Sequence, residues 1–151
     1  MKLDANELPH LVAGVCLEVH RQLGPGLPAP VYRDCLDREL RLRELVYQRN
    51  SPLPIWYRGE RLSSAEIAVD FVIEDQLVLL VSAEEICDVD PNVSGRRELE
   101  TYLRLSGLGS GLWVNFNVDD LRNGMRRLVS SPREAAAAAG AGGIGAGASR
   151  N

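Results

Sequence analysis

Apolar and polar residues follow two patterns in one stretch near the middle of the chain, residues 67–85. Over residues 67–73 they alternate, with Val69, Phe71 and Ile73 on one side of the pattern, which is typical of a half-buried strand. After the polar residues 74–76, the run 77–81 is apolar throughout, as in a strand that is covered on both faces. The stretch therefore predicts a hairpin at the centre of a sheet.

A helical pattern extends over residues 3–23 and stops at a segment of glycine and proline. Asp4 or Asn6 can cap its first turn, because short polar side chains accept hydrogen bonds from the unpaired N–H groups of a helix start. The apolar stripe of this helix comprises Leu11, Val12, Val15, Cys16, Val19 and Leu23. Residues 24–30, GPGLPAP, contain two glycines and three prolines, so no regular element is expected to cross them.

A second helical pattern covers residues 31–45. Its inward positions are Val31, Cys35, Leu36 and Leu40. Its solvated face is expected to consist of Arg33, Asp37, Arg38, Arg41 and Glu44. Charged side chains are ordinary on the outer face of a surface helix, so they indicate no binding function by themselves.

The remaining patterns alternate between strand and helix. In chain order they predict strands at 45–48 and 53–59, a turn at 90–92, a helix at 96–105, a strand at 111–117, a helical turn at 118–124 and a strand at 125–129. In the helix, Leu99, Tyr102 and Leu103 face inward, and Gly107 and Gly109 end it. This order predicts an α/β (α+β) fold in which helices flank a mixed central sheet of four to six strands.

Residues 131–151 are rich in alanine and glycine and cannot bury a core, so we expect them to form a disordered tail. Residues 1–130 are expected to form a single domain. The 151-residue chain is 45% hydrophobic, which is enough for one core of ordinary size.

Charge and cysteine usage narrow the classes of partner and compartment. A formal net charge of -4 provides no chain-wide attraction to nucleic acid or to an anionic membrane, and no apolar run approaches the ~18 residues of a membrane span. Cys16, Cys35 and Cys87 form no CxxC pair, so free thiols are expected rather than a zinc site or disulfides. The cytoplasm is the expected compartment.

Asp70 interrupts the first strand of the central hairpin and is the leading candidate for chemistry. A carboxylate on a half-buried strand is costly unless a partner, a metal ion or water lies beside it. Function is therefore to be sought around Asp70.

Several separate motifs resemble one family in order and spacing over residues 10–129. They are VHRQLGPGLPAPVY, LDRELRLREL, PLPIWYRGERL, VDFVIED, TYLRLSGLGSGLWVNFNV and RNGMRRLV. Together they resemble the bacterial GxxExxY proteins, a branch of the PD-(D/E)XK nuclease superfamily. The resemblance implies a restriction-endonuclease-like core and a divalent-metal phosphodiesterase site on the two central strands.

The motif positions of that family are only partly kept. Gly26 and Tyr32 match the signature, but Ala29 stands at its glutamate position. Asp70 matches the motif aspartate, whereas Leu80 and Ser82 stand where the motif glutamate and lysine are expected. Glu98 falls at the position of a helical glutamine, and Gly95 at that of a histidine.

These substitutions predict a catalytically inactive nuclease-like domain that is retained for binding or as a scaffold. Mg²⁺ requires oxygen ligands, and Leu80 offers none, so Asp70 alone is a weak metal anchor and no cofactor is expected. Ser82 is neutral, and the only lysine of the chain is Lys2. The partner is open: nucleic acid, another protein or a second copy of the chain.

The alternative is a Mg²⁺- or Mn²⁺-dependent nuclease with a displaced site. Leu80, Ser82 and Glu84 alternate onto one face of the strand, so Glu84 lies one repeat, about 6–7 Å, beyond the lost ligand. Together with Asp70 and Glu98 it could supply three carboxylates. The competing interpretation is that Glu84 is a solvated strand end and that Glu98 pairs with an arginine on the helix surface.

Weaker candidates are histidines and arginines. His20 is expected to pack at the end of the first helix rather than to catalyse, and His10 is expected to be exposed. A local basic surface for phosphate could be built from Arg96, Arg97, Arg104, Arg122, Arg126 and Arg127. Because acids are interspersed with these arginines, an ordinary solvated surface is the competing interpretation.

Overall fold

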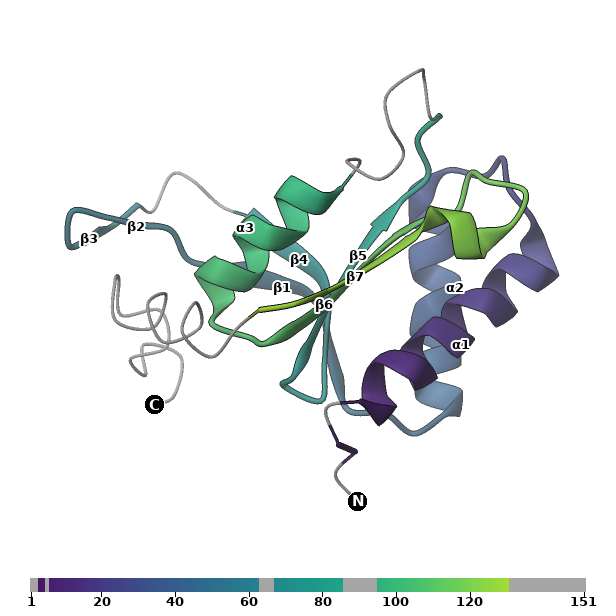
Figure 1. The fold of residues 1–151 in the computed structure, drawn as a ribbon, viewed down its shortest axis with the longest axis horizontal. Helices are drawn as coiled ribbons and strands as arrows, with labels where there is room; N and C mark the ends of the chain where they lie inside the picture. Colours follow the sequence, from purple (N-terminus) through teal and green to yellow (C-terminus); the bar gives the residue numbers. More distant parts are fainter. Residues whose placement is uncertain (1–2, 5, 63–66, 86–94, 131–151) are drawn as a thin grey trace.

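The computed structural model describes residues 3–4, 6–62, 67–85 and 95–130, with helices flanking a central sheet (Figure 1). In chain order the elements are α1 (Glu7–Leu23), α2 (Ala29–Leu42), β1 (Tyr47–Leu53), β2 (Trp56–Tyr57), β3 (Glu60–Arg61), β4 (Ile67–Ile73), β5 (Leu77–Ser82), α3 (Arg96–Ser106), β6 (Ser110–Asn115), the 3-10 helix η1 (Leu121–Gly124) and β7 (Met125–Val129). The predicted α+β fold is confirmed.

Five strands form the main sheet in the order β1-β4-β5-β6-β7. β5 and β6 are parallel, whereas the other neighbouring pairs are antiparallel. β5 lies in the middle, and its residues 77–81 are all buried. This confirms the prediction of a central hairpin in a mixed sheet, and the arrangement is consistent with a restriction-endonuclease-like core.

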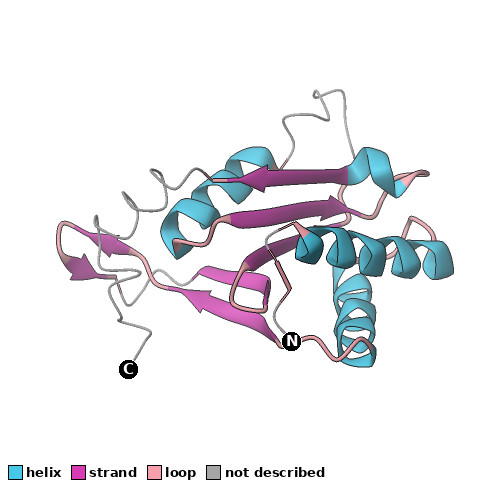
Figure 2. Cartoon of the chain, turned by 60° about the horizontal axis from the view of Figure 1, so that its bottom comes forward, coloured by secondary structure: helices cyan, strands magenta, loops and turns pink. Residues whose placement is uncertain are grey.

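The segment between α2 and β4 differs from the prediction. β1 continues through the polar residues 49–51 to Leu53, because its backbone pairs with β4 while its outer positions remain exposed at the sheet edge. Residues 53–59 do not form one strand, since Pro54 has no N–H to continue a ladder. Instead β2 and β3 form a separate hairpin around a turn at Arg58–Gly59, and Figure 2 shows it projecting from the main sheet.

One face of the main sheet is covered by α1 and α2. Its apolar cluster joins both helices to the three middle strands and to the segment after β6, and includes Tyr32, Leu36, Leu40, Phe71, Ile73, Leu77, Leu79, Leu112 and Phe116. Cys16 belongs to it, and burial raises the pKa of this thiol to about 12. Cys16 and Cys35 are free thiols, as predicted.

α1 begins later than residue 3. The carboxylate of Asp4 accepts hydrogen bonds from the backbone N–H groups of Asn6 and Glu7, both at 2.8 Å, and the helix starts at Glu7. Asp4 therefore satisfies the helix start, whereas the side chain of Asn6 makes no capping bond. Leu23, predicted to face inward, is 38% exposed because it is the last residue of the helix.

α2 presents a different inward face from the one predicted, and it spans Ala29–Leu42 rather than 31–45. Tyr32 is fully buried and stacks on Phe116 at a centroid distance of 4.4 Å, whereas Val31 is 37% exposed. The Tyr32 hydroxyl donates to the carbonyl oxygen of Gly24 at 2.6 Å and accepts from the backbone N–H of Leu27 at 3.2 Å. These bonds allow a polar atom to be buried, so the tyrosine takes the inward position.

The opposite face of the sheet is covered by α3. Leu99 and Leu103 pack there with Val78, Leu80 and Trp113, as the helical pattern predicted for the two leucines. Close approach of α3 to β6 requires Gly111, where an added Cβ would lie 2.6 Å from Leu99 Cδ1. At the C-terminus of α3, Gly107 has φ 71°, so this part of the prediction is also confirmed.

Some predictions fall outside the described residues: the turn at 90–92, the tail at 131–151 and the thiol of Cys87. Within the described part of the chain, no helix has the length and apolar character that a membrane span requires.

Candidate functional site

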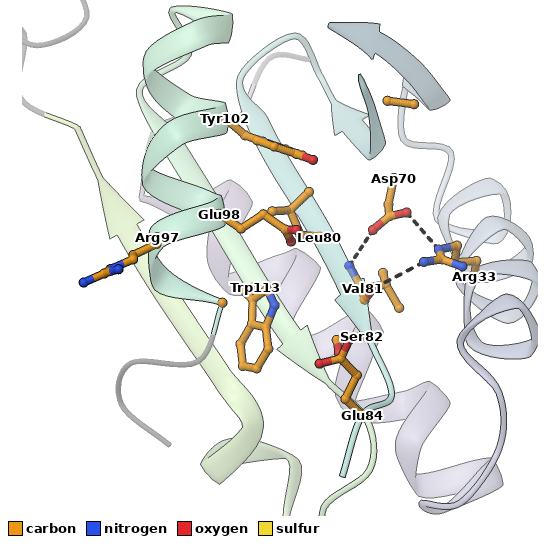
Figure 3. Close-up of a pocket in the computed structure, with 12 residues that line it drawn as sticks. Arg33, Asp70, Leu80, Val81, Ser82, Glu84, Arg97, Glu98, Tyr102 and Trp113 are labelled. Atoms are coloured by element: carbon orange, nitrogen blue, oxygen red, sulfur yellow. Dashed lines mark hydrogen bonds and ion pairs between the residues drawn. The ribbon is translucent and has the colours of Figure 1, made fainter. Parts of the chain in front are cut away.

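A cleft of about 490 Å³ opens beside the C-terminal half of β5 (Figure 3). Residues from α2, β4, β5, α3 and β6 line it, together with Glu84, which follows β5, and Gly95, which precedes α3. Asp70, Glu84 and Glu98, the three carboxylates predicted as a displaced site, all lie on its walls. Leu80 and Ser82 line the same cleft.

Asp70 lies where β4 and β5 begin to separate. The last backbone pair between these strands is Phe71 with Leu79. One residue further, the Asp70 Oδ2 accepts a hydrogen bond from the backbone N–H of Val81 at 2.7 Å. The carboxylate thereby satisfies a donor at the end of the ladder, where an unpaired N–H would be costly.

Arg33 supplies the partner that a half-buried carboxylate requires. Its Nε donates to Asp70 Oδ1 at 2.8 Å, and its Nη2 lies 3.5 Å from the carbonyl oxygen of Val81. The side chains of Arg33 and Asp70 are 31% and 21% exposed, respectively. The prediction that Arg33 lies on a solvated face of α2 is therefore wrong, because the side chain follows Tyr32 inward and spans the cleft wall.

The other two carboxylates approach the cleft from its rim. Figure 3 shows Glu98 extending from α3 toward Leu80, and Glu84 beside Ser82. Partial burial raises the pKa of Glu98, and the negative charges of Asp70 and then Glu84 raise it further. Asn115, which is 2% exposed, donates through its Nδ2 to the backbone carbonyl of Glu84 at 2.9 Å and so helps to fix this end of β5.

Aromatic side chains complete the wall on the α3 side. Burial raises the pKa of Tyr102, and the charges of Glu98 and Asp70 add to the effect. The Trp113 ring packs against Gly95, where an added Cβ would lie 2.0 Å from the ring and where φ is 72°. Gly95 is therefore the residue that lets α3 begin directly over this tryptophan, which the sequence pattern did not reveal.

One family model matches the chain, over residues 6–128, and it describes the PD-(D/E)XK nuclease superfamily. The chain belongs to this superfamily. The match includes every helix and all but the last residue of the described strands. No curated protein matches the chain with statistical significance, and neither does any solved structure.

The superfamily motif positions, in the register of the sequence resemblance, are gathered in the cleft but differ in chemistry. Asp70 is present, Ser82 is half-buried and neutral, and Leu80 is only 2% exposed within the apolar cluster under α3. The position of the motif glutamate is thus occupied by packed apolar surface. Of the three positions, only Asp70 carries a charge.

The oxygen atoms of Asp70 and its neighbours do not suit Mg²⁺ as they are arranged. Both carboxylate oxygens of Asp70 already accept hydrogen bonds, and the nearby carbonyl oxygen of Val81 faces the Arg33 guanidinium. Magnesium needs near-octahedral oxygen coordination, which two engaged acceptors beside a fixed cation do not provide. Among the described residues, no group of three or more His, Cys, Asp or Glu side chains is arranged to hold a metal ion.

The weaker candidates lie in ordinary structural roles. His20 Nε2 lies 2.8 Å from the carbonyl oxygen of Val118 and ties the end of α1 to the segment after β6. Two arginines of the suggested basic surface form ion pairs, Arg96 with Glu100 at 2.8 Å and Arg122 with Asp120 at 2.9 Å. These pairs favour a mixed solvated surface over a continuous phosphate-binding patch.

Proposed function

We propose that this chain is a PD-(D/E)XK nuclease-like domain of the GxxExxY branch that lacks metal-dependent catalysis and serves as a binding or scaffold domain. The single observation that supports this most is the environment of Asp70. Arg33 and the backbone of Val81 engage its two oxygens, while Leu80 fills the position of the second acidic ligand.

The expected loss of activity is large. A metal-dependent phosphodiesterase needs an ion that activates water and neutralises the charge that develops on phosphate. Losing one preorganised group of this kind commonly costs about 10²- to 10³-fold in rate. Here the motif glutamate and lysine positions both hold side chains that cannot supply charge.

The class of partner that this site favours is protein, including a second copy of the chain. The walls of the cleft carry three carboxylates, Asp70, Glu84 and Glu98, against two arginines, Arg33 and Arg97, and the whole chain carries a net charge of -4. A polyphosphate backbone would be repelled from such a cleft. Free thiols at Cys16 and Cys35 agree with the cytoplasm as the proposed compartment.

A second candidate function is a Mg²⁺- or Mn²⁺-dependent nuclease that uses Asp70, Glu84 and Glu98. One observation favours it: besides burial, the negative charges of Asp70 and then Glu84 raise the pKa of Glu98, so Glu98 is close enough to both carboxylates to be repelled by them. A bound cation would relieve that repulsion.

Cleavage assays with a metal titration separate the two functions. Supercoiled DNA and single-stranded RNA are incubated with the wild-type protein or Asp70→Asn at millimolar Mg²⁺ or Mn²⁺, and isothermal titration measures metal binding. We expect the two proteins to show the same background. Cleavage by the wild type that disappears in Asp70→Asn, together with millimolar or tighter metal binding, would overturn the non-catalytic proposal.

A further inference from the structure

We propose that the β2–β3 hairpin of one copy of this chain docks into the cleft of a second copy, where its arginines meet the carboxylates of Glu84 and Glu98. The inference rests on the proposed binding function and names its partner, a second copy of the chain. It also gives a role to a hairpin whose apolar side chains belong to neither core cluster.

The β2–β3 hairpin carries apolar side chains that its own chain leaves uncovered. Neither apolar cluster of the described residues includes Ile55, Trp56, Tyr57 or Leu62. Tyr57 is 63% exposed and Leu62 is 37% exposed, on an element that stands clear of the main sheet (Figure 1, Figure 2). Aromatic residues gathered on an exposed projection are typical of a surface that contacts another protein.

The turn of the hairpin presents positive charge beside these aromatic residues. Arg58 and Gly59 have φ of 52° and 83°, as in the tight type I′ turn that joins two paired strands. Arg58 and Arg61 are exposed, and no hydrogen bond or ion pair with another described residue engages either side chain. Tryptophan, tyrosine and arginine are the residue types that most often contribute binding energy at protein interfaces.

The cleft has the complementary property, carboxylates that no cation engages. Arg33 pairs with Asp70, and Figure 3 shows Arg97 directed away from the cleft. No hydrogen bond or ion pair with another described residue engages the carboxylate of Glu84 or Glu98. A guanidinium placed between these two groups would form charge-assisted hydrogen bonds, which are stronger than neutral ones.

The size and walls of the cleft suit inserted side chains. Its volume of about 490 Å³ lies within the range of roughly 300–1,000 Å³ that is usual for ligand pockets. Tyr102 provides an aromatic wall, and the face of such a ring attracts a guanidinium. None of the described residues that line the cleft belongs to the hairpin, so the hairpin of the same chain does not fill it. A second copy supplies a hairpin of complementary charge.

The first test reverses the charge of the hairpin. Sedimentation velocity measures self-association over roughly 10 to 1,000 µM, the range expected of a small, transient interface. We expect the wild type to associate reversibly there and Arg58→Glu/Arg61→Glu to associate at least about tenfold more weakly, because like charges then meet. The control Arg38→Glu/Arg104→Glu makes the same change in net charge at exposed residues of α2 and α3 and should associate as the wild type does.

The second test mixes two charge-reversed proteins. Glu84→Arg/Glu98→Arg alone should not associate, because its positive hairpin meets a positive cleft. Mixed with Arg58→Glu/Arg61→Glu, it should form a heterodimer, because each hairpin then meets a cleft of opposite charge. If the reversed cleft prevents folding, Glu84→Gln/Glu98→Gln removes the charge without reversing it and should weaken self-association about tenfold.

Each result supports or contradicts the proposed contact. A wild type that stays monomeric at the highest concentration would overturn the inference. Self-association that survives the hairpin reversal, or a mixture of folded variants that forms no heterodimer, would overturn it as well. Metal-dependent cleavage by the wild type contradicts the proposed function, whereas a monomeric wild type without cleavage contradicts only this inference.

Discussion

The two faces of the main sheet use the same strands in different ways. Under α1 and α2, the inward side chains of β5 and β6 join one continuous apolar cluster. Under α3, the alternate side chains of the same strands meet a smaller cluster, which borders the open cleft. The short helix α3 covers only part of its face and leaves the C-terminal half of β5 accessible from the cleft.

The two faces also differ in the environment of their carboxylates. Asp37 on α2 accepts hydrogen bonds from the Tyr47 hydroxyl and from Arg49, and the Tyr47 bond is the main reason that the pKa of Asp37 is lowered. Burial raises the pKa of Glu98 on α3, and the like charges of Asp70 and Glu84 raise it further. The carboxylate of Asp37 thus has hydrogen-bonding and cationic partners within the fold, whereas that of Glu98 in the cleft has like-charged neighbours.

The largest expected effect is on the free energy of unfolding when adjacent leucines of β5, one on each face of the sheet, are truncated. Leu79, 0% exposed, belongs to the cluster under α1 and α2, whereas Leu80, 2% exposed, belongs to the cluster beside the cleft. We expect Leu79→Ala to lower the free energy of unfolding by about 4 kcal/mol and Leu80→Ala by about 2 kcal/mol. The smaller cost reflects a cavity that opens to solvent. Urea denaturation measures both, and an equal or reversed order would contradict the distinction between the faces.

A smaller effect is expected at the glycine under Trp113. Gly95→Ala places a Cβ against the Trp113 ring at a left-handed φ, and overpacking of this kind costs about 1–3 kcal/mol in addition to backbone strain of about 1 kcal/mol. Gly107→Ala is the matched control, since Gly107 has φ 71° but no heavy atom within 4 Å of the added Cβ. It should lose only the strain energy. Chemical denaturation of both variants gives the difference, and equal losses would show that the tryptophan contact is unimportant.

The smallest effect is in the pH dependence of stability. Because the pKa of Glu98 is raised in the fold, its ionised form disfavours the folded state, and this penalty disappears as pH falls through the raised pKa toward the ordinary value of 4.5. Glu98→Gln should therefore be slightly more stable than the wild type at neutral pH, and the two should converge below pH 4.5. Thermal unfolding between pH 3.5 and 7.5 measures the difference.

Asp37→Asn provides the control of opposite sign. The pKa of Asp37 is lowered, so its carboxylate stabilises the fold above its ordinary value of 3.8, and that contribution is lost as pH falls below it. This variant should be less stable than the wild type at neutral pH. A pH-independent difference for Glu98→Gln, or the same sign for both variants, would contradict the assignment of the two carboxylates.

Local patterns determine how much of the structure was predictable. The β4–β5 hairpin and α3 follow from alternation, helical period and glycine positions, all of which act within a few residues. The acidic residues of the cleft were predictable, since strand alternation and the family resemblance together indicated Asp70, Glu84 and Glu98, which line it.

The contacts that define the site were not predictable from those patterns. Arg33 and Asp70 are 37 residues apart, and an arginine beside an inward tyrosine also fits a solvated helix face. Likewise, the contact of Gly95 with Trp113 depends on where α3 crosses β6. Such pairings depend on the tertiary arrangement, which periodicity does not encode.

Tyr32 has a consequence for how chains of this kind are classified. Its ring packs on Phe116 and its hydroxyl secures the turn at Gly24, so the fold needs this tyrosine whether or not any reaction takes place. A residue with such a packing role is expected to be kept whether or not a chain catalyses a reaction. The presence of this tyrosine in a related sequence therefore bears on packing, and assigning an enzymatic step to that sequence requires the ionisable groups to be inspected separately.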